Sequence, residues 1–172
     1  MVSVVTQPDR PRGRKLQLQP SCVKQCAEKL GLPLQQPRTL RDDAAFDTLA
    51  ALEPDLIIVA AYGQILPSAV LDVPPHGCLN VHASILPRYR GAAPIQWALL
   101  NGDNETGVTI MRMDAGLDTG DIVTEARTPI GTHDNSQTLH DRLAEMGAEL
   151  LIKTVPGYVS GNIVPQPQPK EG

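Results

Sequence analysis

Two short apolar runs, residues 56–61 and 77–82, constrain the fold of this chain most strongly. The first run is continuously apolar, which is typical of a strand that is covered on both faces, as in parallel sheets, and the second run is interpreted as another strand of this kind. Segments with helical periodicity lie before and after these runs. Strands that alternate with helices favour an open, mostly parallel sheet with helices on both faces. The sequence therefore predicts an α/β fold.

The other elements follow from periodicity and from turn residues. We expect further strands over residues 2–6, 33–36, 106–113 and 122–130, and helices over residues 21–30, 42–52, 93–100 and 136–155. Ser21 is a candidate helix cap, and Gly31 is a candidate helix stop. Residues 10–15 contain Pro11 and Gly13, so they are predicted to form a loop.

Composition excludes several classes of protein. A chain of 172 residues fits one domain with a sizeable core. It has no apolar run of about 18 residues and no signal-peptide core, so we expect a cytoplasmic protein that does not contact membranes. The spacing of the cysteines and histidines predicts neither a disulfide framework nor a metal site. No GxGxxG or Walker motif supports dinucleotide or P-loop binding.

Charge is unevenly distributed along the chain. Residues 1–41 hold eight Lys and Arg against two acids (+6), and residues 42–172 hold seven against seventeen (−10), which sum to −4. Four of the cations are Arg10, Arg12, Arg14 and Lys15. They form either a solvated loop or an arm that contacts phosphates. No aromatic residue is interleaved, so we do not expect this segment to stack on bases.

Asn80 and His82 end the second apolar run, and Asp118 follows in the segment Leu-Asp-Thr-Gly. Residues two apart in a strand share a face, so Asn80 and His82 project together from its carboxyl end, where open α/β sheets bind ligands. An amide donor, an imidazole and a carboxylate in one crevice suit acyl transfer. Each of the three alone could equally be a turn or structural residue. Cys78 shares their alternation, but it is interpreted as a small buried hydrophobe.

The sequence around these three residues resembles that of a known family. Residues 80–96 read Asn-Val-His-Ala-Ser-Ile-Leu-Pro-Arg-Tyr-Arg-Gly-Ala-Ala-Pro-Ile-Gln, and residues 105–121 read Glu-Thr-Gly-Val-Thr-Ile-Met-Arg-Met-Asp-Ala-Gly-Leu-Asp-Thr-Gly-Asp. With Val-Val-Thr-Gln-Pro-Asp-Arg at 4–10 and Ala-Tyr-Gly-Gln-Ile-Leu-Pro at 61–67, they closely resemble the folate-dependent formyltransferases. The members that act on methionyl-initiator tRNA are the most similar, and the resemblance runs along nearly the whole chain. It implies the Rossmann-like fold of that family.

The resemblance also implies the substrates and the site. The formyl donor would be 10-formyltetrahydrofolate, and the acceptor would be the amino group of methionyl-initiator tRNA, in translation initiation. Asn80, His82 and Asp118 match the catalytic trio of the family. Folate-binding positions would be Ser84, Ile85, Leu86 and Pro87, with Tyr62, Gly63, Ile65 and Leu66 lining the pterin pocket. The tRNA-binding positions would be Arg10, Arg12, Arg14 and Lys15, in a basic insertion somewhat shorter than usual.

The resemblance further implies a catalytic domain over residues 1–160, a linker over residues 161–172, and a monomer. It implies that the chain begins at the family's second strand and stops before a C-terminal domain. Without the first strand, the neighbouring strands at residues 2–6 and 56–61 would have unpaired edges, and we expect poor stability and no activity in the isolated chain.

Three alternatives remain open. The acceptor could be another amine, such as glycinamide ribonucleotide or an amino-sugar. The chain could be an inactive fragment that binds tRNA or folate, or a folate hydrolase that releases formate. The segment Arg88-Tyr-Arg-Gly-Ala-Ala-Pro94 and the basic residues near the start favour tRNA.

Overall fold

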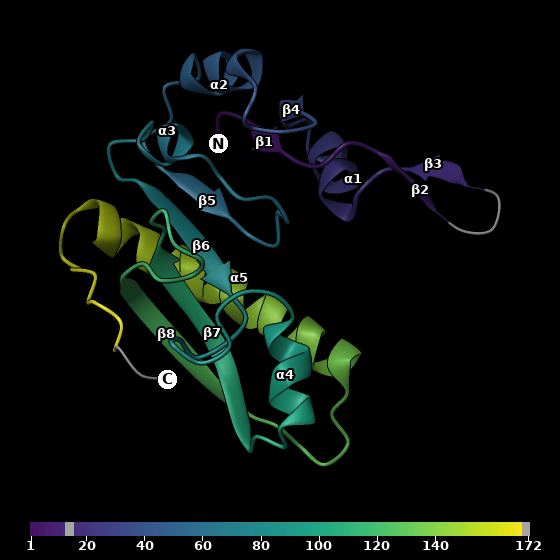
Figure 1. Cartoon of the computed structure of the whole chain (residues 1–172), viewed down its shortest axis with the longest axis vertical. Coiled ribbons are helices and arrows are strands. Elements are labelled where there is room, and N and C mark those ends of the chain that lie inside the picture. The colour runs from purple at the N-terminus through teal and green to yellow at the C-terminus, as the bar shows by residue number, and fades with distance from the viewer. Residues whose placement is uncertain (13–15, 170–172) are drawn as a thin grey trace. The chain divides into compact units, whose positions relative to one another are not determined.

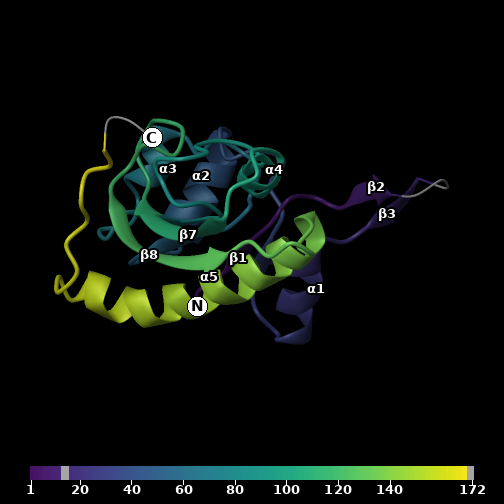
Figure 2. The ribbon, with the colours of Figure 1, turned by 90° about the horizontal axis from the view of Figure 1, so that it is seen from below.

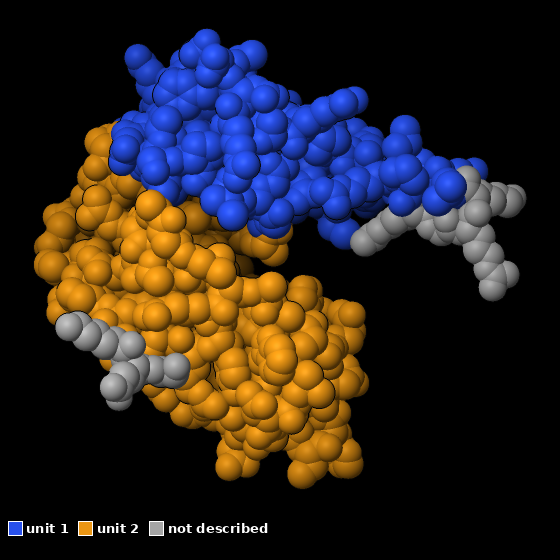
Figure 3. Space-filling view, viewed as in Figure 1, with its two compact units in different colours: residues 1–55, 62–73 blue, residues 56–61, 74–172 orange. Residues whose placement is uncertain are grey.

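The structure, a computed structural model, describes residues 1–12 and 16–169, except for the side chain of Arg12 (Figure 1). The chain divides into two compact units, which Figure 3 colours separately. The first unit comprises residues 1–55 and 62–73, and the second comprises residues 56–61 and 74–172. Both units combine strands with helices, and the α/β fold class is confirmed.

In the first unit, a parallel pair of short strands is connected through a helix, as the sequence predicts. The elements are β1 (Val4–Val5), α1 (Cys22–Lys29), β4 (Leu34–Gln35), α2 (Asp43–Ala50) and α3 (Ser68–Leu71). The Ser21 hydroxyl accepts a 3.0 Å hydrogen bond from the Lys24 backbone amide, which satisfies an unpaired N–H of the first turn. Gly31 takes a φ of 64° just after α1, so both predicted helix signals are confirmed.

The loop predicted for residues 10–15 is wrong at its start. Strands β2 (Arg10–Arg12) and β3 (Gln17–Gln19) pair as an antiparallel ribbon, in which Pro11 is opposite Leu18. Each strand of a two-stranded ribbon has an open edge, and an edge strand tolerates a proline that cannot donate a hydrogen bond. Arg14 and Lys15, with the side chain of Arg12, lie outside the described part of the chain.

The second unit is built on a sheet with strand order β5-β6-β7-β8. Its strands are β5 (Ile57–Val59), β6 (Cys78–His82), β7 (Glu105–Arg112) and β8 (Ile122–Pro129). Strands β5 and β6 are parallel, as are β1 and β4 in the first unit, but β7 is antiparallel to both β6 and β8. The parallel pattern ends there because β7 begins at the end of the sheet where β6 finishes, and a turn then returns the chain to β8.

The first apolar run forms β5. It is not covered on both faces as predicted, because Ile58 is 40% exposed. Strand β5 is the edge of its sheet and pairs only with β6 within the described residues. The resemblance implies a further strand on the other side of β5, and that strand stays a prediction.

The core of the second unit lies between the sheet and two helices, α4 (Pro94–Leu100) and α5 (Ser136–Val159). Figure 2 shows α5 lying along one face of β7 and β8. The buried residues that pack together are Leu79, Ile95, Val108, Ile110, Val123, Leu139 and Leu143. Leu79 and Val81 pack into this core, so the alternating Asn80 and His82 project from the other face of β6. None of the described helices combines the length and apolar character that a membrane crossing requires.

The close contact between α5 and the sheet depends on Gly147. A Cβ atom at this position would lie 2.8 Å from Cγ1 of Val81 and 3.5 Å from Cγ1 of Val108. We expect Gly147→Leu to lower the free energy of unfolding by about 1–3 kcal/mol, since overpacking forces side chains or backbone to shift. Thermal unfolding checks this against Ala148→Leu on the exposed side of the same helix. Equal stability of the two variants would contradict the close packing.

Candidate active site

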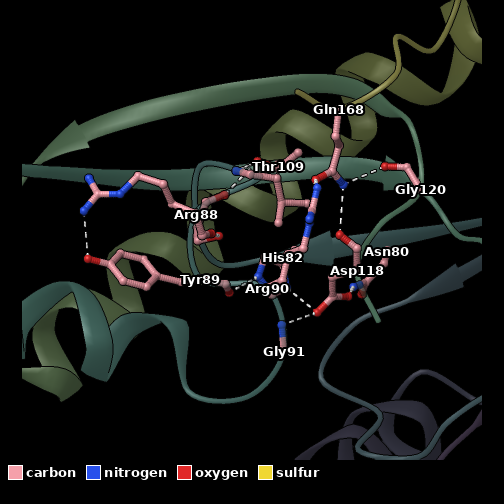
Figure 4. A network of polar contacts seen from close by, with 12 residues as sticks. Asn80, His82, Arg88, Tyr89, Arg90, Gly91, Thr109, Asp118, Gly120 and Gln168 are labelled. Carbon is pink, nitrogen blue, oxygen red and sulfur yellow. Dashed lines mark hydrogen bonds and ion pairs between the residues drawn. The ribbon is translucent and has the colours of Figure 1, made fainter. Parts of the chain in front are cut away.

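The structure brings Asn80, His82 and Asp118 together (Figure 4). The Nδ2 atom of Asn80 donates to Oδ1 of Asp118 at 3.2 Å, and Nδ1 of His82 lies 3.5 Å from Oδ2 of Asp118. The first two residues come from β6, while Asp118 comes from the turn between β7 and β8. The carboxylate therefore links the two polar side chains at the end of β6.

Asp118 is held by the shape of two loops. Its φ of 52° is unusual for a residue with a side chain, and it turns the carboxylate toward β6. The Gly91 backbone amide donates to Oδ2 of Asp118 at 2.8 Å. Gly91 itself has a φ of 86°, and a Cβ atom there would lie 3.1 Å from Cδ2 of Leu117. A glycine therefore allows this amide to approach the carboxylate.

His82 is buried, with 6% of the residue exposed, and both ring nitrogens face oxygen acceptors. Its Nε2 atom lies 3.0 Å from the Tyr89 carbonyl oxygen, while Nδ1 faces Asp118. A carbonyl only accepts, so Nε2 donates to it. A carboxylate oxygen also only accepts, so Nδ1 faces a second acceptor. The cluster therefore places a buried imidazole between a carboxylate and a backbone carbonyl.

The segment from Ser84 to Pro87, predicted to bind folate, is held in place by hydrogen bonds to Arg88 and Thr109. Ser84 is fully buried, and its hydroxyl donates to the Arg88 carbonyl at 2.6 Å. The Thr109 hydroxyl donates to the Ser84 carbonyl at 2.7 Å and accepts from the Leu86 amide at 3.2 Å. Ser84 and Leu86 thus build the loop, while Ile85 and Pro87 remain partly exposed.

A cleft of about 390 Å³ borders this segment. It is lined by Ile85, Leu86, Pro87, Arg88, Tyr89, Asp103, Glu105, Thr106, Ile122, Glu125, Arg127 and Pro169. The three clustered polar residues are not part of its lining. Its cations are already paired, Arg88 with Asp103 at 2.9 Å and Arg127 with Glu105 at 2.7 Å. The cleft therefore presents little unpaired charge to a ligand.

The predicted pterin-pocket residues belong to the first unit. The Tyr62 carbonyl accepts from Nε2 of Gln7 at 2.5 Å, and Gly63 has a φ of 74°. Ile65 is 70% exposed, whereas Leu66 is buried. The Tyr62 hydroxyl is buried and lacks a hydrogen-bond partner among the described residues, and burial raises the pKa of this phenol. An unpaired buried hydroxyl is costly, so it is a candidate contact for a polar ligand atom.

Sequence reasoning missed three residues that shape the cluster. Tyr89 and Gly91 contribute backbone groups, which leave no side-chain signal in the sequence. Gln168 contacts the Asp118 carbonyl from within the predicted linker, where the neighbouring prolines gave no sign of a packed segment. Within residues 1–12 and 16–169, no three His, Cys, Asp or Glu side chains form a metal-ligand group, and a metal-free site stays a prediction.

Comparisons with known proteins show which proteins this chain is similar to. The methionyl-tRNA formyltransferase of Citrifermentans bemidjiense is 54% identical over 168 residues, which are 98% of this chain and 53% of that protein. The methionyl-tRNA formyltransferase of Xylella fastidiosa strain M23 is 56% identical over 170 residues, 99% of this chain and 55% of that protein. The chain thus spans about half the length of these curated relatives.

A solved structure also matches the fold. The formyltransferase PseJ from Anoxybacillus kamchatkensis, in complex with tetrahydrofolate and UDP-4,6-dideoxy-4-formamido-L-AltNAc, superposes with a TM-score of 0.70 at 27% identity. The match covers 98% of this chain and 82% of that one. Residues 1–155, which include the Asn80, His82 and Asp118 cluster, match the protein family described as Formyl transferase. The chain therefore belongs to the formyl transferase family.

Proposed function

We propose that this chain is the catalytic part of an enzyme that transfers a formyl group from 10-formyltetrahydrofolate to the amino group of methionyl-initiator tRNA, in translation initiation. The observation that carries the proposal is the contact of Asn80 and His82 with the two oxygens of Asp118 at the end of β6. An amide, an imidazole and a carboxylate in contact suit formyl transfer between two nitrogens, because such groups can stabilise an oxyanion and move a proton. The activity named for the 54% identical relative supports the acceptor.

The reaction would begin when the acceptor amine attacks the formyl carbon. The formyl oxygen then takes a negative charge, which an N–H of Asn80 would stabilise, since a primary amide has two N–H groups and Asp118 takes one. The charge of the His82 imidazolium would favour the same oxyanion. The bond from the formyl carbon to the folate nitrogen then breaks, as that nitrogen receives the proton that the amine loses. Asp118 or a bound water molecule would carry this proton.

Folate would bind along two segments. In the segment Ser84, Ile85, Leu86 and Pro87, the partly exposed members are Ile85 and Pro87, which would contact the folate. Ser84 and Leu86 are buried and hold the segment in place. In the first unit, Tyr62, Gly63, Ile65 and Leu66 are the positions proposed to contact the pterin, and the Tyr62 hydroxyl, which has no hydrogen-bond partner among the described residues, suits a polar atom of the ring. Titration of the purified chain with tetrahydrofolate measures this binding without any acceptor.

The transfer reaction tests the proposal directly. We define the extended protein as this chain joined to the residues of the Citrifermentans bemidjiense relative that lie outside the match, which covers 53% of that protein. Supplied with 10-formyltetrahydrofolate, it is expected to formylate methionyl-initiator tRNA in preference to glycinamide ribonucleotide or an amino-sugar nucleotide. Formylation of one of the small acceptors alone would replace the proposed substrate, and release of formate without any acceptor would replace transfer by hydrolysis.

The basic residues Arg10, Arg12, Arg14 and Lys15 are proposed to contact the tRNA backbone, because Arg10 is exposed on β2 and the other three follow it in the sequence. Replacing all four by Gln in the extended protein is expected to weaken tRNA binding and to reduce the salt slope of log Kd by up to about one unit for each lost phosphate contact. Tetrahydrofolate binding should not change. The control replaces the exposed Arg38 and Arg41 of the same unit. A salt slope equal to that of the unsubstituted protein would show that these four residues do not contact phosphates of the tRNA.

A further inference from the structure

The segment that follows α5 returns to the sheet beside the candidate active site. The backbone of Gln166 forms an antiparallel bridge with Ile122, the first residue of β8, through hydrogen bonds of 2.8 Å in both directions. Ile122 lies at the end of the turn that carries Asp118. The bridge therefore places Gln168, two residues later, next to this turn.

The Gln168 side chain joins two loops of the site (Figure 4). Its Nε2 atom donates to the carbonyl oxygens of Asp118 at 2.9 Å and of Gly120 at 2.7 Å. Its Oε1 atom accepts from Nε and Nη2 of Arg90 at 3.0 and 2.7 Å. Both ends of the carboxamide are thus occupied. Since Arg90 fixes Oε1, the two N–H bonds of Nε2 point to the Asp118 turn.

This turn needs such support because its backbone is unfavourable on its own. Asp118 has a φ of 52°, which a residue with a Cβ atom rarely adopts. The chain around it is tight, since a Cβ atom at Gly120 would lie only 1.8 Å from the Arg112 carbonyl oxygen. The two carbonyls that Gln168 binds flank Thr119, so one NH₂ group holds both sides of the bend.

We propose that Gln168, oriented by Arg90, is a positioning residue of the formyl-transfer site. It holds the Asp118 turn so that the carboxylate meets Asn80, His82 and the Gly91 amide together. Its role in catalysis rests on the proposed function, whereas its role in holding the turn does not. The residues that the resemblance assigns to a linker thus contribute a side chain that the site depends on.

The direct readout is the Gly91 amide, which donates to Oδ2 of Asp118. In NMR spectra of this chain, Gln168→Ala is expected to move the Gly91 amide proton upfield and to speed its exchange with solvent, since a bond to a carboxylate is lost or lengthened. The matched control is Gln166→Ala, because among the described residues the Gln166 side chain bonds only to the nearby Val164 carbonyl, and its bridge to Ile122 uses the backbone. This variant should leave the Gly91 signal in place.

Kinetics on the extended protein supply the second readout. Gln168→Ala is expected to lower kcat by roughly 10- to 100-fold with little change in KM for either substrate, because a catalytic group displaced by about 1 Å can cost that much. Gln168→Glu keeps an oxygen for Arg90 but replaces the two donated N–H bonds, so it should lose a similar factor. Arg90→Lys, which removes the paired donation to Oε1, tests the same arrangement if Gln168→Ala does not fold.

The outcomes separate the two levels of the proposal. An unchanged Gly91 amide in a folded Gln168→Ala or Gln168→Glu variant would overturn the positioning role. Wild-type kcat in Gln168→Glu would do the same. A shifted Gly91 amide, together with no formyl transfer by the unsubstituted extended protein, would overturn the proposed function while the structural role of Gln168 stands.

Discussion

Replacing His82 by Ala in the extended protein is expected to slow formyl transfer by about 10²-fold or more, while tetrahydrofolate still binds. The loss follows because the buried His82 ring lies next to Asn80 and Asp118 in the cluster, and groups that act on the proton or the oxyanion usually contribute at least this factor. Steady-state rates with methionyl-tRNA, paired with tetrahydrofolate titrations, measure both quantities.

His140→Ala is the matched control for this substitution. His140 is also paired with an aspartate, since its Nδ1 lies 3.1 Å from Oδ1 of Asp141, but its side chain is 63% exposed on α5. The control should keep its rate. A His82→Ala variant within about threefold of the unsubstituted rate would remove His82 from the mechanism, because a catalytic proton or oxyanion group contributes far more.

Asp118→Asn is expected to be similarly damaging, with a loss of about 10²-fold or more, although the side chain keeps its shape. The carboxylate accepts from Asn80 and Gly91 and faces Nδ1 of His82, whereas an amide has one oxygen and presents two N–H groups. One donor of the cluster would then meet another donor. The neutral amide also places no negative charge beside the His82 ring.

Rates measured against pH decide what Asp118 does. The control is Asp121→Asn in the same turn, since the structure records no contact between the Asp121 side chain and the cluster within its described residues. If Asp118→Asn kept both the rate and the pH profile of the unsubstituted protein, Asp118 would be a turn residue only. A large loss confined to Asp118→Asn would place the effect on the cluster.

Much of the fold could be predicted because its signals are local. The cap at Ser21 and the stop at Gly31 bound α1 as expected, since each acts on its own helix end. Strand pairing could not be read in the same way. The reversal at β7 and the pairing of β2 with β3 depend on which backbone groups meet across the chain, and periodicity carries no information about the partner.

The same distinction separates the parts of the candidate site. Asn80 and His82 could be paired from sequence, because alternation in one strand places them on one face. Asp118 required the family resemblance, since Asp-Thr-Gly alone is an ordinary turn. Gly91 and Gln168 could not be found, because the amide of one and the side chain of the other matter only after distant loops meet at Asp118.

The most direct test of the account is whether His82 and Asp118 act as one unit. Single-turnover rates of formyl transfer by the extended protein would be compared for His82→Ala, Asp118→Asn and the double variant. Residues that work through each other lose their contribution together, so the double variant is predicted to be about as slow as the slower single variant. If the two losses instead multiply, the residues act independently, and the contact seen between His82 and Asp118 is not the basis of catalysis.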